Sequence, residues 1–170
     1  MAKRSGLPAL RFRGRGRLWA ALALAFAGPC PALAQGTVSV LPVQGLRFGV
    51  LASGIPAVVS PLDGSRRAVI ELVGTGHVSL SFELPGRLQG GSGHGVLPVH
   101  FGPGDGRVTF PGSPQVLVFD PSQPVSFTIP PGSGGATVHL GGSVLADSRQ
   151  PPGAYDAAFT VNVVVASPAT

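Results

Sequence analysis

The chain is poor in residues that crosslink proteins or carry charge. Its 170 residues include one cysteine, Cys30, and one lysine, Lys3, and only 11% are charged. A domain formed by the residues after Cys30 can contain no disulfide, so a buried core must hold it together. Without a lysine, the same residues can form neither a Schiff base nor a lysine-to-asparagine isopeptide crosslink.

The positive charge is concentrated near the N-terminus. Six of the twelve basic residues precede an uncharged apolar run of ten residues, 18–27. This run is much shorter than the roughly 20 residues of a transmembrane helix, and a small-x-small sequence that signal peptidase could cut ends at Ala34. We therefore expect residues 1–34 to be a helical, cleavable signal peptide, cut between Ala34 and Gln35, with no membrane anchor in the mature form.

Removal of this segment would change the sign of the net charge. The whole chain is formally +5, but from Gln35 onward six arginines stand against all seven acidic residues, which gives −1. The basic surface that attracts nucleic acid would be lost with the signal peptide. We therefore expect no nucleic-acid partner.

Beyond residue 35, hydrophobic and polar residues alternate with the period of a β-strand. In one run Val78, Leu80 and Phe82 fall on the same face. Similar runs cover residues 68–73, 125–129, 138–146 and 155–165. Turn sequences such as Pro85-Gly86 separate the runs, so the 26 glycines and 18 prolines do not indicate a low-complexity linker. The pattern predicts an all-β, antiparallel β-sandwich of about seven to ten strands in two packed sheets.

One short sequence resembles the nucleophile elbow of serine hydrolases. Residues 90–94, Gly-Gly-Ser-Gly-His, begin like G-x-S-x-G, but His94 replaces the last glycine. An elbow also needs a strand before it and a helix after it, and neither is predicted here. We therefore expect a hairpin loop at Ser92 and no catalytic residue.

The candidate metal ligands are similarly sparse. Residues 102–106, Gly-Pro-Gly-Asp-Gly, contain one carboxylate where a calcium loop needs several oxygen ligands, so we expect a hairpin turn. No two histidines have the short spacing typical of a metal site. We therefore expect no metal or other cofactor, and no enzyme activity, from the four histidines: His77, His94, His100 and His139.

Three segments together resemble a known family. They are residues 46–49 (LRFG), residues 84–86 (LPG) and the ending 152–163 (PGAYDAAFTVNV). In this respect the chain is similar to the DUF4402 family of exported bacterial proteins. The resemblance covers about residues 46–165 and implies a pilin-like, immunoglobulin-like sandwich in the periplasm or at the surface of a Gram-negative bacterium. It implies no activity and no catalytic residue.

These observations favour an exported structural or adhesive surface protein, a fimbrial-like subunit assembling by β-strand addition with itself or with other surface subunits. Residues 46–170 would form the sandwich, and residues 35–45 would be an extension or its first strand. As an extension they could be the donor strand, because Val38 and Val40 alternate with polar residues. The alternative is a soluble periplasmic module that binds an unidentified ligand with the loops of the sandwich.

Overall fold

The computed structural model describes residues 37–91 and 95–166. These residues form strands joined by turns and contain no helix, and every strand pair is antiparallel. The all-β, antiparallel prediction is therefore confirmed. The strands are β1 (Val38–Gln44), β2 (Pro56–Val59), β3 (Ala68–Gly74), β4 (Gly76–Glu83), β5 (Arg87–Gly90), β6 (Val96–His100), β7 (Gly106–Thr109), β8 (Val116–Phe119), β9 (Val125–Ile129), β10 (Gly135–Leu140), β11 (Gly142–Leu145), β12 (Tyr155–Asp156) and β13 (Thr160–Ala166).

The alternating sequence explains why these segments are strands. In β3, Ala68, Ile70 and Leu72 are buried, while Glu71 and Val73 between and after them are exposed. A strand places successive side chains on opposite faces, so each such segment can bury one face and leave the other in solvent. The same pattern is seen in β4, β9 and β13.

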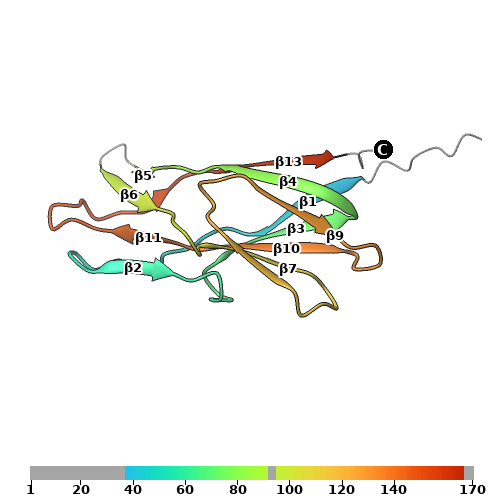
Figure 1. Cartoon of the computed structure of the whole chain (residues 1–170). Helices are drawn as coiled ribbons and strands as arrows, with labels where there is room; N and C mark the ends of the chain where they lie inside the picture. Colours follow the sequence, from blue (N-terminus) through green and yellow to red (C-terminus); the bar gives the residue numbers. More distant parts are fainter. Residues whose placement is uncertain (1–36, 92–94, 167–170) are drawn as a thin grey trace, which may run out of the picture. The chain divides into compact units, whose positions relative to one another are not determined.

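The strands form three sheets among the described residues. Their orders are β1-β3-β10-β7-β8, β12-β5-β6-β11-β2 and β13-β4-β9. In Figure 1, β13 and β4 run along one side of the domain and β3, β10 and β7 along the other. The β-sandwich prediction is confirmed, although the described residues form 13 strands in three sheets where about seven to ten strands in two sheets were expected. Two of the expected long strands are divided between sheets: residues 138–146 into β10 and β11, and residues 155–165 into β12 and β13.

A large core lies between the first sheet and the β13-β4-β9 sheet. Buried residues of β3, β4, β7, β8, β9 and β10 contribute to it. Two aromatic contacts tie the sheets together: Phe82 stacks on Phe119 with ring centroids 6.0 Å apart, and Phe110 meets Phe127 edge-on at 5.9 Å. We call this core the first core cluster. Its buried members are Ala68, Ile70, Leu72, Val78, Leu80, Val108, Phe110, Phe119, Phe127, Ile129, Ala136, Val138 and Leu140.

A smaller core lies on the sheet that contains β5, β6 and β11. Its buried members are Leu97, Val99, Val144 and Ala146, and we call them the second core cluster. Partly buried side chains pack on it from the segment after β1 and from β12, including those of Phe48 and Tyr155. The second cluster forms one wall of the cavity described below.

The predicted signal peptide and its cleavage site, Ala34 and Gln35, lie outside the described residues. Residues 37–91 and 95–166 contain no helix long and apolar enough to cross a membrane.

Candidate functional site

The serine and histidine of the elbow-like sequence, Ser92 and His94, lie outside the described residues. The residues on either side form a hairpin, because β5 and β6 pair through Leu88 and Leu97, and the amide of Gly90 donates to the carbonyl of Gly95 at 3.1 Å. The prediction of a hairpin connection at this position is confirmed.

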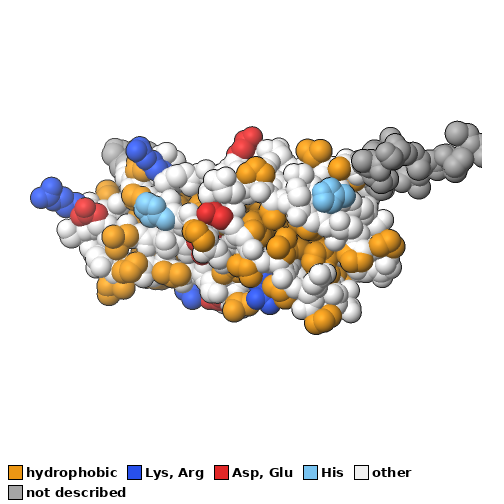
Figure 2. All heavy atoms as spheres, viewed as in Figure 1, with side chains coloured by type: hydrophobic (Ala, Val, Ile, Leu, Met, Phe, Trp, Pro, Cys, Tyr) orange, Lys and Arg blue, Asp and Glu red, His pale blue; other side chains and the backbone are white. Residues whose placement is uncertain are grey.

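The described histidines lie on separate strands, and Figure 2 shows histidine side chains at well-separated places on one face of the molecule. The ring of His77 is 3.2 Å from the hydroxyl of Thr128, and His100 is exposed on β6. Within the described residues, no three His, Cys, Asp or Glu side chains come together as a metal site would require.

His139 differs from the other two because it is buried, with an exposed fraction of 7%. Its Nε2 lies 3.3 Å from the hydroxyl of Thr109 across the β10–β7 pair. Burial, followed by the positive charges of Arg67 and Arg107, lowers the pKa of His139 to about 4. The imidazole is therefore neutral at neutral pH.

The carboxylate of Asp105 is used within its own loop. It accepts a hydrogen bond from the amide of Gly102 at 2.9 Å, and the amide of Asp105 donates to the Gly102 carbonyl at 3.1 Å. The result is a tight turn, as the sequence predicts. It is not a hairpin, because it connects β6 to β7, and these strands belong to different sheets.

The proposed donor residues, Val38 and Val40, lie in β1 and pair with β3 of the same chain. Val40 lies opposite the buried Leu72, so its side chain is on the core face of the sheet, yet it is 36% exposed. The strand contains Pro42, and its pairing with β3 shifts register between Pro42 and Gln44. The sandwich is thus incompletely covered along β1.

Strand β13 forms a longer uninterrupted edge. Its one hydrogen-bonded neighbour among the described strands is β4, and its seven residues include no proline and no charged side chain. Val161 and Val163 pack against the first core cluster but are only partly buried, and Val164 on the other face is 63% exposed. Natural edges usually carry charges, prolines or bulges that block further pairing, and β13 has none of these.

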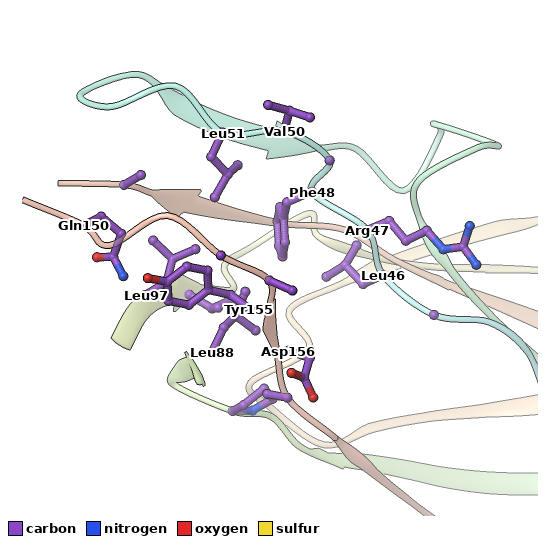
Figure 3. A pocket seen from close by; sticks show the side chains of 18 of the residues that line it. Leu46, Arg47, Phe48, Val50, Leu51, Leu88, Leu97, Gln150, Tyr155 and Asp156 are labelled. Carbon is purple, nitrogen blue, oxygen red and sulfur yellow. The ribbon is translucent and has the colours of Figure 1, made fainter. Parts of the chain in front are cut away.

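A cavity of about 810 Å³ lies between the segment after β1 and the sheet of β5, β6 and β11. Figure 3 shows Leu51 and Phe48 pointing from one side toward Tyr155 and Leu97 on the other, whereas Val50 points away. Leucine, valine, phenylalanine and alanine side chains make up most of the wall. They include Leu46, Phe48, Leu51, Leu84, Leu88, Leu97, Val99, Phe101, Ala146 and Phe159.

A few polar groups interrupt this apolar lining. The Tyr155 hydroxyl donates to the carbonyl of Pro151 at 2.6 Å. The side-chain nitrogen of Gln150 is buried and has no hydrogen-bond partner among the described residues. Gly95 has a φ of 109° and lies so close to the Tyr155 hydroxyl that a larger residue would displace the ring. The glycine therefore leaves the space that the Tyr155 hydroxyl occupies at the cavity wall.

Sequence reasoning did not find this cavity, although the signal for it was present. Residues from all three segments that resemble DUF4402, within 46–49, 84–86 and 152–163, line its wall. These segments are far apart in sequence and contain no reactive side chains that would have marked them as a site. Their shared location became visible only when the sheets were assembled.

In the comparisons with known proteins, no family model, no curated protein and no solved structure matches this chain. The resemblance to DUF4402 therefore stays a prediction.

Proposed function

We propose that this protein is an exported structural or adhesive surface protein, a pilin-like subunit that assembles by β-strand addition. The observation that carries the proposal is the edge of β13, which no other described strand covers and which is uncharged over Thr160–Ala166. Export to the periplasm or the surface of a Gram-negative bacterium is proposed from the sequence of residues 1–34 and from the resemblance to DUF4402. No catalytic role is proposed.

An added strand would gain both hydrogen bonds and apolar contacts at this edge. Its backbone would pair with the free amide and carbonyl groups of β13. Its inward side chains would extend the cover over the first core cluster beside the partly buried Val161 and Val163. Burial of apolar area supplies roughly 25 cal/mol per Å².

We propose residues 35–45 of a neighbouring subunit as the donor strand. Val38 and Val40 alternate with Thr37 and Ser39, so that one face of the donor would be apolar. In its own domain the described part of this segment, β1, is an edge strand whose one partner among the described strands is β3, and its central residues are exposed. Its release would therefore break the hydrogen bonds of a single strand pair.

Replacement of Val164 by lysine tests the proposal. Val164 is 63% exposed on the face of β13 opposite the core, so Val164→Lys adds a charge to the edge without disturbing the core. The matched control is Val118→Lys on β8, another edge strand, where the valine is 57% exposed. Multimers of the mature chain would be measured by light scattering and by native mass spectrometry.

We expect the unmodified chain and Val118→Lys to form multimers. For Val164→Lys, we expect the ratio of monomer to multimer to be at least tenfold higher at the same concentration. A strictly monomeric unmodified chain at high concentration would contradict assembly. Equal assembly of both lysine variants would show that β13 is not the acceptor edge.

A further inference from the structure

We propose that the cavity between the segment after β1 and the β5-β6-β11 sheet binds an uncharged, mainly apolar small molecule that carries a hydrogen-bond acceptor. This goes beyond strand addition, because the ligand and its site differ from the added strand and the β13 edge. The cavity is walled mainly by side chains of the second core cluster and those packed on it.

The size and lining of the cavity fit this class of ligand. Its volume of about 810 Å³ lies within the range of roughly 300–1,000 Å³ typical of small-molecule sites. Such sites combine apolar and aromatic walls with a few placed polar groups, as this one does with Phe48, Leu97 and Tyr155. An apolar wall of this extent is unfavourable in contact with water, so an apolar occupant would stabilise the domain.

Gln150 supplies the polar anchor. Its side-chain nitrogen is buried and has no partner among the described residues, which is costly for an amide donor. In Figure 3 the amide of Gln150 lies beside Tyr155 and Leu97 at the cavity wall. In the conformation shown, protein atoms cover this nitrogen beside Gly95, so a carbonyl or ether oxygen of a ligand would accept its hydrogen bond after a rotation of the Gln150 side chain toward the cavity. The Tyr155 hydroxyl proton is already donated to the Pro151 carbonyl, whereas the Gln150 amide is a buried donor without a partner among the described residues.

The charges around the cavity favour an uncharged ligand over a fatty-acid anion. Asp147 and Asp156 belong to the lining. Arg47 also belongs to it, but its guanidinium group points away from the cavity in Figure 3. Both acidic residues are exposed, so a carboxylate ligand would meet their negative charge near the opening and find no inward-facing Arg47 to compensate its own.

Binding can be measured with a neutral fluorescent dye and two competitors. N-phenyl-1-naphthylamine, an uncharged apolar dye that brightens in apolar surroundings, would be titrated into the mature chain. Methyl decanoate and decanoate would then compete for the site; they share an acyl chain but differ in charge. The single tyrosine, Tyr155, lies at the cavity wall, and residues 35–170 contain no tryptophan, so its fluorescence reports occupancy independently.

Two tryptophan variants locate the binding site. Leu51→Trp would fill the cavity, whereas Val58→Trp adds the same side chain at an exposed position of β2 outside the cavity lining. The emission maximum of the new tryptophan checks its placement, since a buried indole emits at shorter wavelength. We expect Leu51→Trp to weaken dye binding at least tenfold and Val58→Trp to change it less than twofold.

Gln150→Leu tests the role of the Gln150 amide in binding. It also provides a second test of the site if Leu51→Trp does not fold. We expect this variant to bind the dye normally but to bind methyl decanoate about three- to tenfold more weakly, the effect of one lost neutral hydrogen bond.

Saturable binding of one dye per chain, displaced by the ester more effectively than by decanoate, would support the proposal. It would be overturned if the unmodified chain bound no dye, if a folded Leu51→Trp bound it normally, or if Gln150→Leu bound the ester unchanged. Stronger binding of decanoate would overturn the preference for an uncharged ligand.

Discussion

His139 illustrates how one residue can be polar in sequence and buried in structure. It alternates with Val138 and Leu140, which belong to the first core cluster, so its side chain lies on the opposite face of β10. On that face it is nevertheless buried, with only 7% of its surface exposed. It is also close enough to Arg67 and Arg107 for their charges to affect its pKa. The imidazole must therefore be neutral in the stable folded state.

This residue predicts a pH dependence of stability. The pKa of His139 is about 4 in the folded chain and 6.5 in an unperturbed histidine, so between these values the unfolded chain binds the extra proton. The free energy of unfolding should therefore fall as the pH drops from 6.5 to 4, and this contribution should level off below pH 4. Urea unfolding at several pH values measures it.

His139→Gln is the control, because glutamine does not titrate in this range. We expect the variant to lose the part of the pH dependence that lies between pH 6.5 and 4. A variant whose stability changes with pH as steeply as that of the unmodified chain would show that other groups cause the effect.

At the scale of elements, Gly141 allows β10 and β11 to follow each other in different sheets. A Cβ atom at this position would collide with the carbonyl oxygen of Val59 and press on the ring of Pro61. The amide of Gly141 also donates to the Asp105 carbonyl at 2.7 Å, so the backbone cannot easily move aside. The close approach of Gly141 to the segment at Val59 and Pro61 therefore requires glycine.

We expect Gly141→Ala to lower the free energy of unfolding by about 2 kcal/mol or more, a typical effect of overpacking in a rigid site. Gly86→Ala is the matched control, since a Cβ there meets no atom within 4 Å. Chemical denaturation of both variants measures the difference. Equal stability of the two would mean that the crossing can relax to accept a side chain.

At the scale of the molecule, continuous stretches of chain connect the two core clusters. The stretches β4–β5, β10–β11 and β12–β13 each run from the sheets around the first cluster to the sheet of the second. If one cluster unfolds, the strands that support the other lose their anchor. The domain should therefore unfold in one transition, as is usual for domains of this size.

Tyr155 provides the measurement, because it packs on the second cluster and is the single tyrosine of the chain. We expect its fluorescence and the far-ultraviolet circular dichroism to give the same urea midpoint. If tyrosine fluorescence changed at a lower urea concentration, the second cluster would unfold separately.

Much of the strand content could be predicted from the sequence. Alternation identified Ala68, Ile70 and Leu72 as one buried face and Val125, Phe127 and Ile129 as another, because strand periodicity depends on neighbouring residues. The division of long runs at Gly141 and before Thr160 was not predicted. Those breaks depend on which sheet each half joins, and this is decided by contacts with distant strands.

The sequence by itself determined that the described domain is all-β, that it contains no disulfide, and which faces of several strands are buried. Only the tertiary structure decided that residues 46–51, 84–88 and 153–159 meet around one cavity, and that one edge of β13 is left unpaired by the strands described. The physical reason is the range of the interactions. Backbone alternation and crosslinking chemistry are local properties, whereas a cavity and an unpaired edge result from the way sheets assemble from segments far apart in the chain.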